Sequence, residues 1–195
     1  MVETRKFRWT QLVGFIIIAG LTVEVVFLSI QNRQLKNVLK SRTMISQVES
    51  LKAGEKVEPL KIQTLEGETT VLSYNDPAKK YLLCVFSTTC PHCEKILPAW
   101  QTLAEKNNDN CFVIGISIHN VDETRKYVTA KKVGFYSVSA SSDTSFNRKY
   151  KISGVPETIL LDGNGKVQKA WVGELTSEQT IEIQALLSAS QTLAN

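Results

Sequence analysis

Two cysteines separated by two residues carry the strongest chemical signal in this sequence. Cys90 and Cys93 flank Pro91 and His92, and this motif follows an apolar run directly and opens a helical pattern. A thiol at a helix N-terminus meets unpaired backbone N–H groups and the positive end of the helix dipole, and both favour the thiolate. The motif therefore predicts thiol–disulfide exchange. Cys90, at the exposed start of the helix, would attack, and Cys93, one turn further in, would resolve the mixed disulfide.

The two residues between the cysteines are expected to tune the acidity of the pair. Pro91 fits the first helical turn, where its missing N–H would have no helical partner anyway. A protonated His92 would place a cation beside the Cys90 sulfur and stabilise its thiolate. A stabilised thiolate means a stabilised reduced state, and therefore a more oxidising couple. The alternative for His92 is a solvated imidazole without effect.

A proline before a later strand supports the redox interpretation. Gly154, Val155 and Pro156 precede the apolar run 158–161. A cis X-Pro bond is uncommon in folded proteins and is usually a specific feature of a tight turn. A trans proline that only delimits the strand is the alternative, but after a Cys-x-x-Cys unit between strand and helix we expect the cis form.

The sequence pattern around these residues predicts an α/β domain that begins near residue 53. Apolar and alternating runs predict short strands at 60–65 and 69–72, buried strands at 81–87 and 111–118, and strands at 158–161 and 167–172 around a turn at 162–165. Helical spacing is found at 96–106, with Pro98 inside it, at 121–132 and at 176–187 with Thr176 as N-cap. The order predicts a mixed sheet with a parallel core, flanked by helices.

This combination resembles the thioredoxin-like proteins, over about residues 53–190. The motif at the strand–helix junction, the kinking Pro98, the Gly-Val-Pro entry and the turn after it look like thioredoxin. The expected N-terminal anchor and the 66 residues from Cys90 to Pro156 make the chain most similar to the membrane-anchored TlpA/ResA/CcmG group of redoxins. The resemblance implies that Cys90 attacks, that Cys93 resolves and that a cis Pro156 lies beside Cys90. It also implies that the Val155 backbone pairs with the substrate chain. Several members reduce apocytochrome c thiols.

Two features depart from the reductase pattern. Pro91-His92, with Val155 before the proline, resembles the oxidase DsbA, so a dithiol oxidase that introduces disulfides is the alternative function. Thioredoxin also keeps a buried acid six residues before its first cysteine, and here that position is Cys84. Cys84 and Cys111 fall in apolar runs and are interpreted as buried free thiols. A disulfide between these two is the alternative.

The N-terminal part of the chain predicts a membrane anchor. Residues 12–30 form a mainly apolar run in which Glu24 is the only charge, and 19 residues nearly suffice to cross the hydrocarbon core. No small-residue cleavage pattern follows the segment, which argues against a signal peptide. We therefore expect a tail at 1–11, a transmembrane helix at 12–30, a helical stalk at 31–52 and a thioredoxin-like domain at 53–195. The catalytic domain would face the periplasm or cell exterior of a bacterium.

Composition and motifs weigh against other classes of protein. The formal charge is +4 without a basic run longer than two residues, which argues against nucleic-acid binding. A thiol peroxidase would need Pro and Thr where Leu83 and Ser87 stand. A metal-binding or metallochaperone module could use Cys90, Cys93 and His119, but a closed zinc site needs four ligands. We therefore expect no cofactor beyond the cysteine pair. The expected partners are protein thiols or disulfides and a membrane partner that recycles the pair.

Overall fold

The computed structural model describes residues 17–22, 24, 25, 27–29, 50–106 and 111–188. The chain divides into two compact units, Met1–Gln47 and Val48–Asn195. The described residues of the first unit are helical, and six of them expose large apolar side chains: Ile17, Ile18, Leu21, Val25, Phe27 and Leu28.

The predicted anchor at 12–30 falls only in part on described residues, and the stalk at 31–52 lies almost wholly outside them. In the ranges that the structure covers, no helix is long and apolar enough to cross a membrane. The anchor and the stalk therefore stay predictions.

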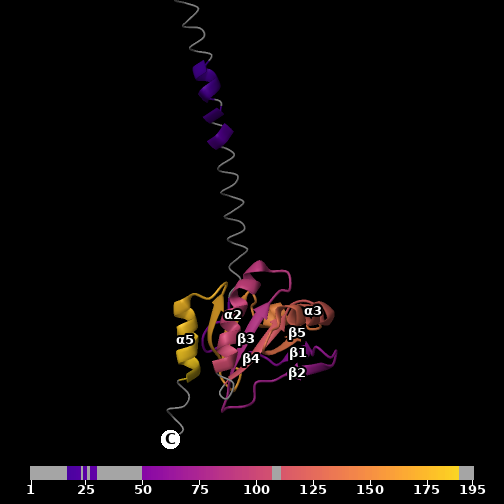
Figure 1. The fold of residues 1–195 in the computed structure, drawn as a ribbon. Coiled ribbons are helices and arrows are strands. Elements are labelled where there is room, and N and C mark those ends of the chain that lie inside the picture. The colour runs from indigo at the N-terminus through magenta and orange to yellow at the C-terminus, as the bar shows by residue number, and fades with distance from the viewer. Residues whose placement is uncertain (1–16, 23, 26, 30–49, 107–110, 189–195) are drawn as a thin grey trace, which may run out of the picture. The chain divides into compact units, whose positions relative to one another are not determined.

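The second unit is built on a mixed sheet whose strands run in the order β2-β1-β5-β4-β3-β6-β7 (Figure 1). Its strands are β1 (Leu60–Gln63), β2 (Thr69–Leu72), β3 (Lys80–Phe86), β4 (Cys111–Ser117), β5 (Tyr136–Ser139), β6 (Glu157–Leu161) and β7 (Val167–Val172). Strands β3, β4 and β5 are parallel, whereas β6 is antiparallel to both β3 and β7. The sheet therefore has the predicted mixed character, with β2 and β7 at its edges.

Helices cover both faces of this sheet. They are α2 (Pro91–Lys106), α3 (Val121–Lys131), the short α4 (Phe146–Lys149) and α5 (Ser177–Ser188). In β3, Leu82, Cys84 and Phe86 face the core shared with α2, α3 and α5, and the alternate residues face the core shared with α4. This alternation follows from the pleat, which turns successive side chains to opposite faces. Because β3 is covered on both faces, it reads as one continuous apolar run.

Sequence reasoning missed β5 and α4. β5 lies in the interior of the sheet and has the sequence Tyr-Ser-Val-Ser. Its two serines interrupt the apolar run that is expected of an interior strand. Both serines are buried, and their hydroxyls donate to the backbone oxygens of Phe135 and His119. Helix α4 spans only four residues, which is too short for a periodic signal. Helix α2 also begins at Pro91, five residues before the predicted periodic stretch.

The predicted turn and cap at the C-terminal end are confirmed. Asp162 Oδ1 accepts hydrogen bonds from the backbone N–H groups of Asn164 and Lys166, which closes the turn between β6 and β7. Thr176 Oγ1 accepts from the backbone N–H of Gln179, and Gln179 Oε1 accepts from that of Thr176. This reciprocal pair is a capping box for α5.

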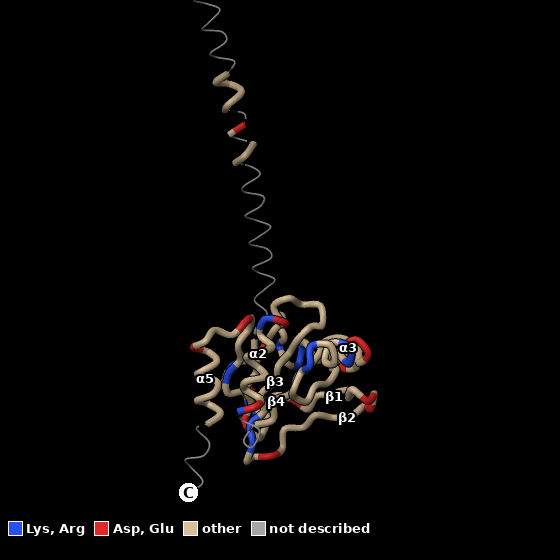
Figure 2. Tube along the Cα trace, viewed as in Figure 1, with Lys and Arg blue, Asp and Glu red and all other residues tan. Residues whose placement is uncertain are grey.

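Basic and acidic residues are mixed along the second unit and do not gather on one side of it (Figure 2). This distribution agrees with the small net charge of +4. It provides no concentrated basic stripe of the kind on which nucleic-acid affinity depends.

Candidate active site

The two cysteines of the motif lie at the start of α2, where β3 gives way to the helix. Cys90 directly precedes Pro91, the first residue of α2, and is partly exposed, whereas Cys93 is fully buried. The backbone N–H groups of Cys93 and Glu94 both donate to the Cys90 carbonyl, so Cys90 occupies the N-cap position. Both sulfurs are free thiols in this structure. An incoming disulfide can therefore reach Cys90 but not Cys93.

Burial also makes the Cys93 thiol a weaker acid. It raises the pKa of the Cys93 thiol to about 12, while the backbone of Ser87 acts in the opposite direction. A hydrogen bond and repulsion from Cys90 add to the rise. Cys93 is therefore protonated at neutral pH in the reduced protein, as expected of a thiol that acts second.

The predicted cis proline is confirmed, since the Val155–Pro156 peptide bond is cis. The bond lies next to the motif, because the Cys90 thiol donates to the Val155 carbonyl oxygen at a distance of 3.6 Å. Residues 65 positions apart in sequence thus meet at one sulfur. The pairing of the Val155 backbone with a substrate chain, which the resemblance implies, stays a prediction.

His92 points to the surface and meets a residue that sequence reasoning missed. Its Nδ1 lies 2.6 Å from Glu174 Oε1, and Lys95 Nζ lies 3.5 Å from the same oxygen. The hydrogen bond from His92 and the charge of Lys95 lower the pKa of the Glu174 carboxyl. Glu174 stands 82 residues from His92, between β7 and α5, so no local pattern could have linked them.

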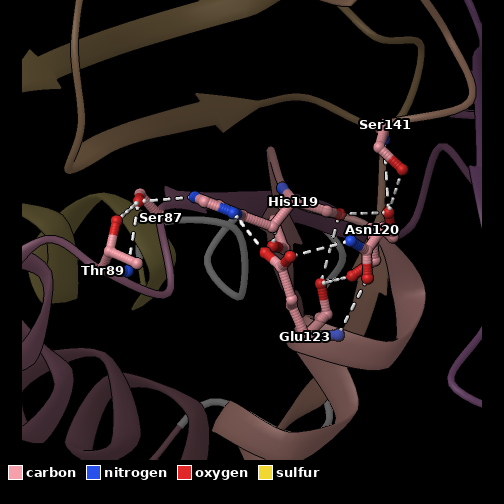
Figure 3. A network of polar contacts seen from close by, with 9 residues as sticks. Ser87, Thr89, His119, Asn120, Glu123 and Ser141 are labelled. Carbon is pink, nitrogen blue, oxygen red and sulfur yellow. Dashed lines mark hydrogen bonds and ion pairs between the residues drawn. The ribbon is translucent and has the colours of Figure 1, made fainter.

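A polar network joins Ser87, three residues before Cys90, to His119 and Glu123 (Figure 3). The Ser87 hydroxyl is 2.8 Å from His119 Nε2, and His119 Nδ1 is 2.7 Å from Glu123 Oε2. Ser87 also accepts from the backbone N–H of Thr89. His119 follows β4, and Glu123 lies in the first turn of α3. The sequence pointed to His119 only as a metal ligand.

The structure does not assemble that metal site. In the part of the chain that is described, no three His, Cys, Asp or Glu side chains lie together so that they could hold a metal ion. Both ring nitrogens of His119 are instead hydrogen-bonded, Nε2 with Ser87 and Nδ1 with Glu123. The alternative with Cys90, Cys93 and His119 as ligands is thus not supported by their placement.

Helix α3 brings a second group to the sulfurs. Tyr127 packs on Phe86 with a ring separation of 5.3 Å and is nearly buried. Burial raises its pKa to about 12, and negative charge on Glu94, Cys93 and Cys90 adds to the rise. The phenol is therefore neutral at physiological pH. It contributes an apolar wall rather than a charge.

Cys84 and Cys111 behave as buried thiols. Cys84 lies opposite Gly115, and Cys111 lies opposite Lys80, so four residues of strand separate the two positions. This corresponds to about 13 Å along the strands, beyond the reach of a disulfide. Burial raises the pKa of Cys84 well above its usual value. Cys84 is thus no substitute for the acid that thioredoxin holds there.

A buried acid does exist nearby, but on the other face of the sheet. Glu157 begins β6 and is fully buried, and neither carboxylate oxygen has a hydrogen-bond partner. Burial raises the pKa of the Glu157 carboxyl to about 7. The backbone of Ser153 has the opposite but smaller effect on this pKa. Thr158 receives a hydrogen bond from Trp100 of α2, so Glu157, its neighbour in the strand, points away from α2. The acid between Pro156 and an apolar run was the signal that sequence reasoning overlooked.

A reactive thiol at a strand–helix junction with a cis proline against its sulfur is the arrangement by which one protein disulfide is exchanged for another. Together with the mixed sheet and its helices, it defines the class of thioredoxin-like thiol–disulfide oxidoreductases.

Comparisons with known proteins agree. A thioredoxin-like family model matches residues 78–167. Sporulation thiol-disulfide oxidoreductase A of Bacillus subtilis is 25% identical over 126 residues, which cover 62% of this chain and 74% of that protein. Thiol-disulfide oxidoreductase ResA of Halalkalibacterium halodurans is 25% identical over 138 residues, 70% of this chain and 77% of that protein. These matches support thiol–disulfide oxidoreductase activity and make the chain similar to thioredoxin-like proteins of the TlpA/ResA/CcmG type.

Solved structures give the same result. The crystal structure of StoA from Bacillus subtilis superimposes with a TM-score of 0.53 at 25% identity, over 64% of this chain and 95% of that chain. For the fold alone, a thiol:disulfide interchange protein DsbE from Chlorobium tepidum gives a TM-score of 0.62 at 22% identity, over 72% and 99% of the two chains.

Proposed function

We propose that this enzyme exchanges disulfides outside the cytoplasm, with Cys90 as the attacking thiol and Cys93 as the resolving thiol. The observation that carries the proposal is the unequal burial of the pair beside Val155. Cys90 is partly exposed and touches the Val155 carbonyl, whereas Cys93 lies one turn deeper without access to solvent. Only one order of attack is sterically open to a protein substrate.

The substrate is proposed to bind along the residues before the cis proline. A main-chain segment beside Val155 could pair with its backbone while its own sulfur meets Cys90. The surface beside the motif is hollowed by a shallow pocket of about 450 Å³, lined by Thr89, Pro91, Glu94 and Lys95. Both charge signs occur at its wall, so a polar peptide segment fits it.

The direction of transfer is proposed to be reductive, towards exported proteins, with apocytochrome c thiols as one candidate substrate. The resemblance to the ResA type supports this direction, since Thiol-disulfide oxidoreductase ResA is among the relatives. Dithiol oxidation is the second candidate, because the exposed His92 beside Cys90 favours the thiolate form when it is protonated. A membrane partner would recycle the cysteine pair in either case.

The location is proposed to be a bacterial cytoplasmic membrane, with a single anchor and the catalytic domain outside. The apolar segment 12–30 supports the anchor, as do the six large apolar side chains that its described helical residues expose. Disulfide exchange on exported proteins would also require this side of the membrane. A C-terminal alkaline phosphatase fusion should be active, and an inactive fusion that is expressed at normal levels would contradict the orientation.

Substitution of the resolving thiol tests the proposed roles. Cys93→Ser should accumulate mixed disulfides between Cys90 and its substrates in cells, because the second attack is removed. Cys90→Ser is the matched control and should accumulate none. Mass spectrometry of the trapped complexes identifies the substrates. Trapping through Cys93 in the Cys90→Ser variant, with none in Cys93→Ser, would reverse the assignment.

The reduction potential of the full chain decides the direction. A value of about −270 mV, as in thioredoxin, is expected for a reductase, and a value of about −120 mV, as in DsbA, would establish the oxidase alternative. Equilibration with glutathione buffers followed by alkylation of free thiols measures it.

A further inference from the structure

Thr89 directly precedes Cys90 and joins the surface of the motif to the polar network of Figure 3. Its side chain is exposed and forms part of the wall of the pocket beside the motif. Its hydroxyl lies 3.1 Å from the Ser87 hydroxyl, and its backbone N–H donates to the same Ser87 oxygen at 3.3 Å. A hydroxyl at the proposed substrate surface is therefore hydrogen-bonded to a buried one.

Ser87 carries this contact on to an imidazole. The buried Ser87 hydroxyl lies 2.8 Å from His119 Nε2, and His119 Nδ1 lies 2.7 Å from Glu123 Oε2. Hydrogen bonds between side chains thus run without a break from Glu123 to the wall of the pocket.

The directions of these hydrogen bonds follow from the number of hydrogens available. A carboxylate only accepts, so His119 Nδ1 carries the hydrogen that is shared with Glu123. In the neutral ring Nε2 is then an acceptor, and it receives the single hydroxyl hydrogen of Ser87. The Ser87 oxygen in turn accepts from the N–H and from the hydroxyl of Thr89. The Thr89 oxygen therefore offers a ligand in the pocket lone pairs only.

Protonation of the His119 ring reverses this order. Nε2 then donates to the Ser87 oxygen, which still accepts from the Thr89 N–H. The Ser87 hydroxyl hydrogen turns to Thr89 Oγ1, and the hydrogen of the Thr89 hydroxyl becomes available to the pocket. The charge of the ring thus decides whether Thr89 accepts a hydrogen bond from a ligand or donates one.

The His119 backbone is held in place by neighbouring elements. Its carbonyl accepts from the hydroxyls of Ser139 and Thr124, and its N–H donates to the Ser117 hydroxyl. The His119 side chain is only about one-quarter exposed. The ring is therefore preorganised towards Ser87 before any substrate binds.

We infer that the Thr89 hydroxyl accepts a hydrogen bond from a backbone N–H of the substrate chain beside its cysteine, and that His119 sets this polarity through Ser87. The inference rests on the proposed function, since a protein substrate must reach Cys90. Every residue except proline carries a backbone N–H, so this acceptor suits protein substrates of different sequence. Thr89 would contact the substrate, whereas Ser87, His119 and Glu123 are positioning residues.

Charged groups from two helices lie around the network and the pocket. Glu123 of α3 contacts the His119 ring. Glu94 and Lys95 of α2 line the pocket, and each is paired with an oppositely charged side chain. An imidazole changes its charge between about pH 5 and 8, so a pH test must separate His119 from His92.

Attack on a peptide disulfide tests the contact. The probe is a pentapeptide of alanines with a central cysteine that carries thionitrobenzoate in a disulfide. The Cys90 thiolate of the reduced full chain attacks the peptide sulfur, and thionitrobenzoate leaves as a coloured thiolate whose release gives the rate constant. Two ester analogues replace the N–H of the cysteine, or of the residue after it, by oxygen. At pH 8 one of them should react about five- to tenfold more slowly than the amide peptide.

The two neighbouring threonines provide a matched pair of variants. Thr89→Val removes the hydroxyl at nearly constant shape, so it should slow the amide peptide by a similar factor and react equally with amide and ester. Thr89→Ser should restore the preference for the amide. Thr88→Val makes the same change one residue away and should keep the wild-type preference. A full preference in Thr89→Val, or its absence in the wild type with both analogues, would overturn the contact.

The ratio of amide to ester rate constants reports the polarity of Thr89, because the thiolate fraction of Cys90 cancels from it. In the wild type this ratio should fall several-fold from pH 8 to about pH 5, as the imidazole gains its proton. His92→Gln should keep the fall, and Ser87→Ala should abolish it by breaking the link to His119. A constant wild-type ratio, or a fall that persists in Ser87→Ala, would overturn the role of His119.

Failure of the proposed function would look different. A wild type that releases no thionitrobenzoate from any of the three peptides would contradict disulfide exchange itself. Release at the wild-type rate by Cys90→Ser would contradict the role of Cys90. Either result concerns the thiol and precedes any comparison of amide with ester.

Discussion

At the scale of single residues, solvent access decides the order in which the two thiols react. Cys90 and Cys93 are only three residues apart, yet one lies at the rim of the fold and the other in the core beneath α2. Burial raises the pKa of the Cys93 thiol and keeps it protonated at neutral pH. The two side chains are chemically identical, so their different roles follow from their positions in the fold.

His92 is predicted to tune the reduction potential of the pair. A protonated ring would place a cation near the Cys90 sulfur and favour the reduced state. His92→Gln should lower the reduction potential by up to about 30 mV, because the ring is well exposed and its charge is screened. Equilibration with glutathione buffers at pH 6 measures the shift.

Glu174→Gln separates charge from contact in this experiment. It keeps the imidazole and removes the carboxylate that lies 2.6 Å from it. If both variants lowered the potential equally, the tuning would require the charge of the Glu174 carboxylate, because a Gln side chain can still accept a hydrogen bond from the ring. An unchanged potential in His92→Gln would leave the ring without a tuning role.

At the scale of elements, one buried hydrogen bond joins the helix of the thiols to the strand of the cis proline. Trp100 Nε1 of α2 donates to Thr158 Oγ1 of β6 at 3.0 Å, and both side chains are buried. Thr158 also lies opposite Cys84 in β3. The bond thus fixes the distance between the motif and Pro156.

Loss of either partner of this bond should destabilise the fold. Thr158→Val leaves the indole N–H buried without an acceptor and should reduce the free energy of unfolding by about 1–3 kcal/mol. Trp100→Phe removes the donor and opens space beneath α2, at a similar cost. The double variant should be less destabilised than the two single variants added together, by about 1 kcal/mol. Urea unfolding measures all three, and strictly additive costs would show that the bond contributes nothing.

At the scale of the whole molecule, Glu157 couples the stability of the fold to pH. Its carboxyl is buried without a partner, and its pKa is raised from 4.5 to about 7. Below pH 4.5 both the folded and the unfolded chains carry the proton, and this stability is fully present. As pH rises towards 7, the unfolded chain loses the proton first, so the unfolded state gains and the free energy of unfolding falls.

This fall should reach about 3 kcal/mol by pH 7 and then level off. Glu157→Gln removes the ionisation, so its free energy of unfolding should lack this part of the pH dependence. The difference between wild type and variant, followed by urea unfolding from pH 4 to 8, isolates it from other groups. A constant difference across this range would show that Glu157 ionises normally in the folded protein.

The sequence by itself determined the parts of this protein that depend on neighbours along the chain. The cysteine spacing, the junction of strand and helix, the turn at 162–165 and the cap at Thr176 are local, so a short window of sequence contains all their determinants. β3 and β4 could also be predicted, because a strand that is buried on both faces requires a continuous apolar run. These features sufficed for the class of enzyme.

Only the tertiary structure decided which residues from distant parts of the sequence lie around the motif. Glu174 meets His92 across 82 residues, and Ser87 meets His119 across 32. The register of β3 and β4 separated Cys84 from Cys111, and the pleat turned Glu157 away from α2. Such contacts depend on strand pairing and helix packing, which bring together residues whose spacing in sequence carries no period. The reactive pair was therefore readable in advance, whereas its charged neighbours were not.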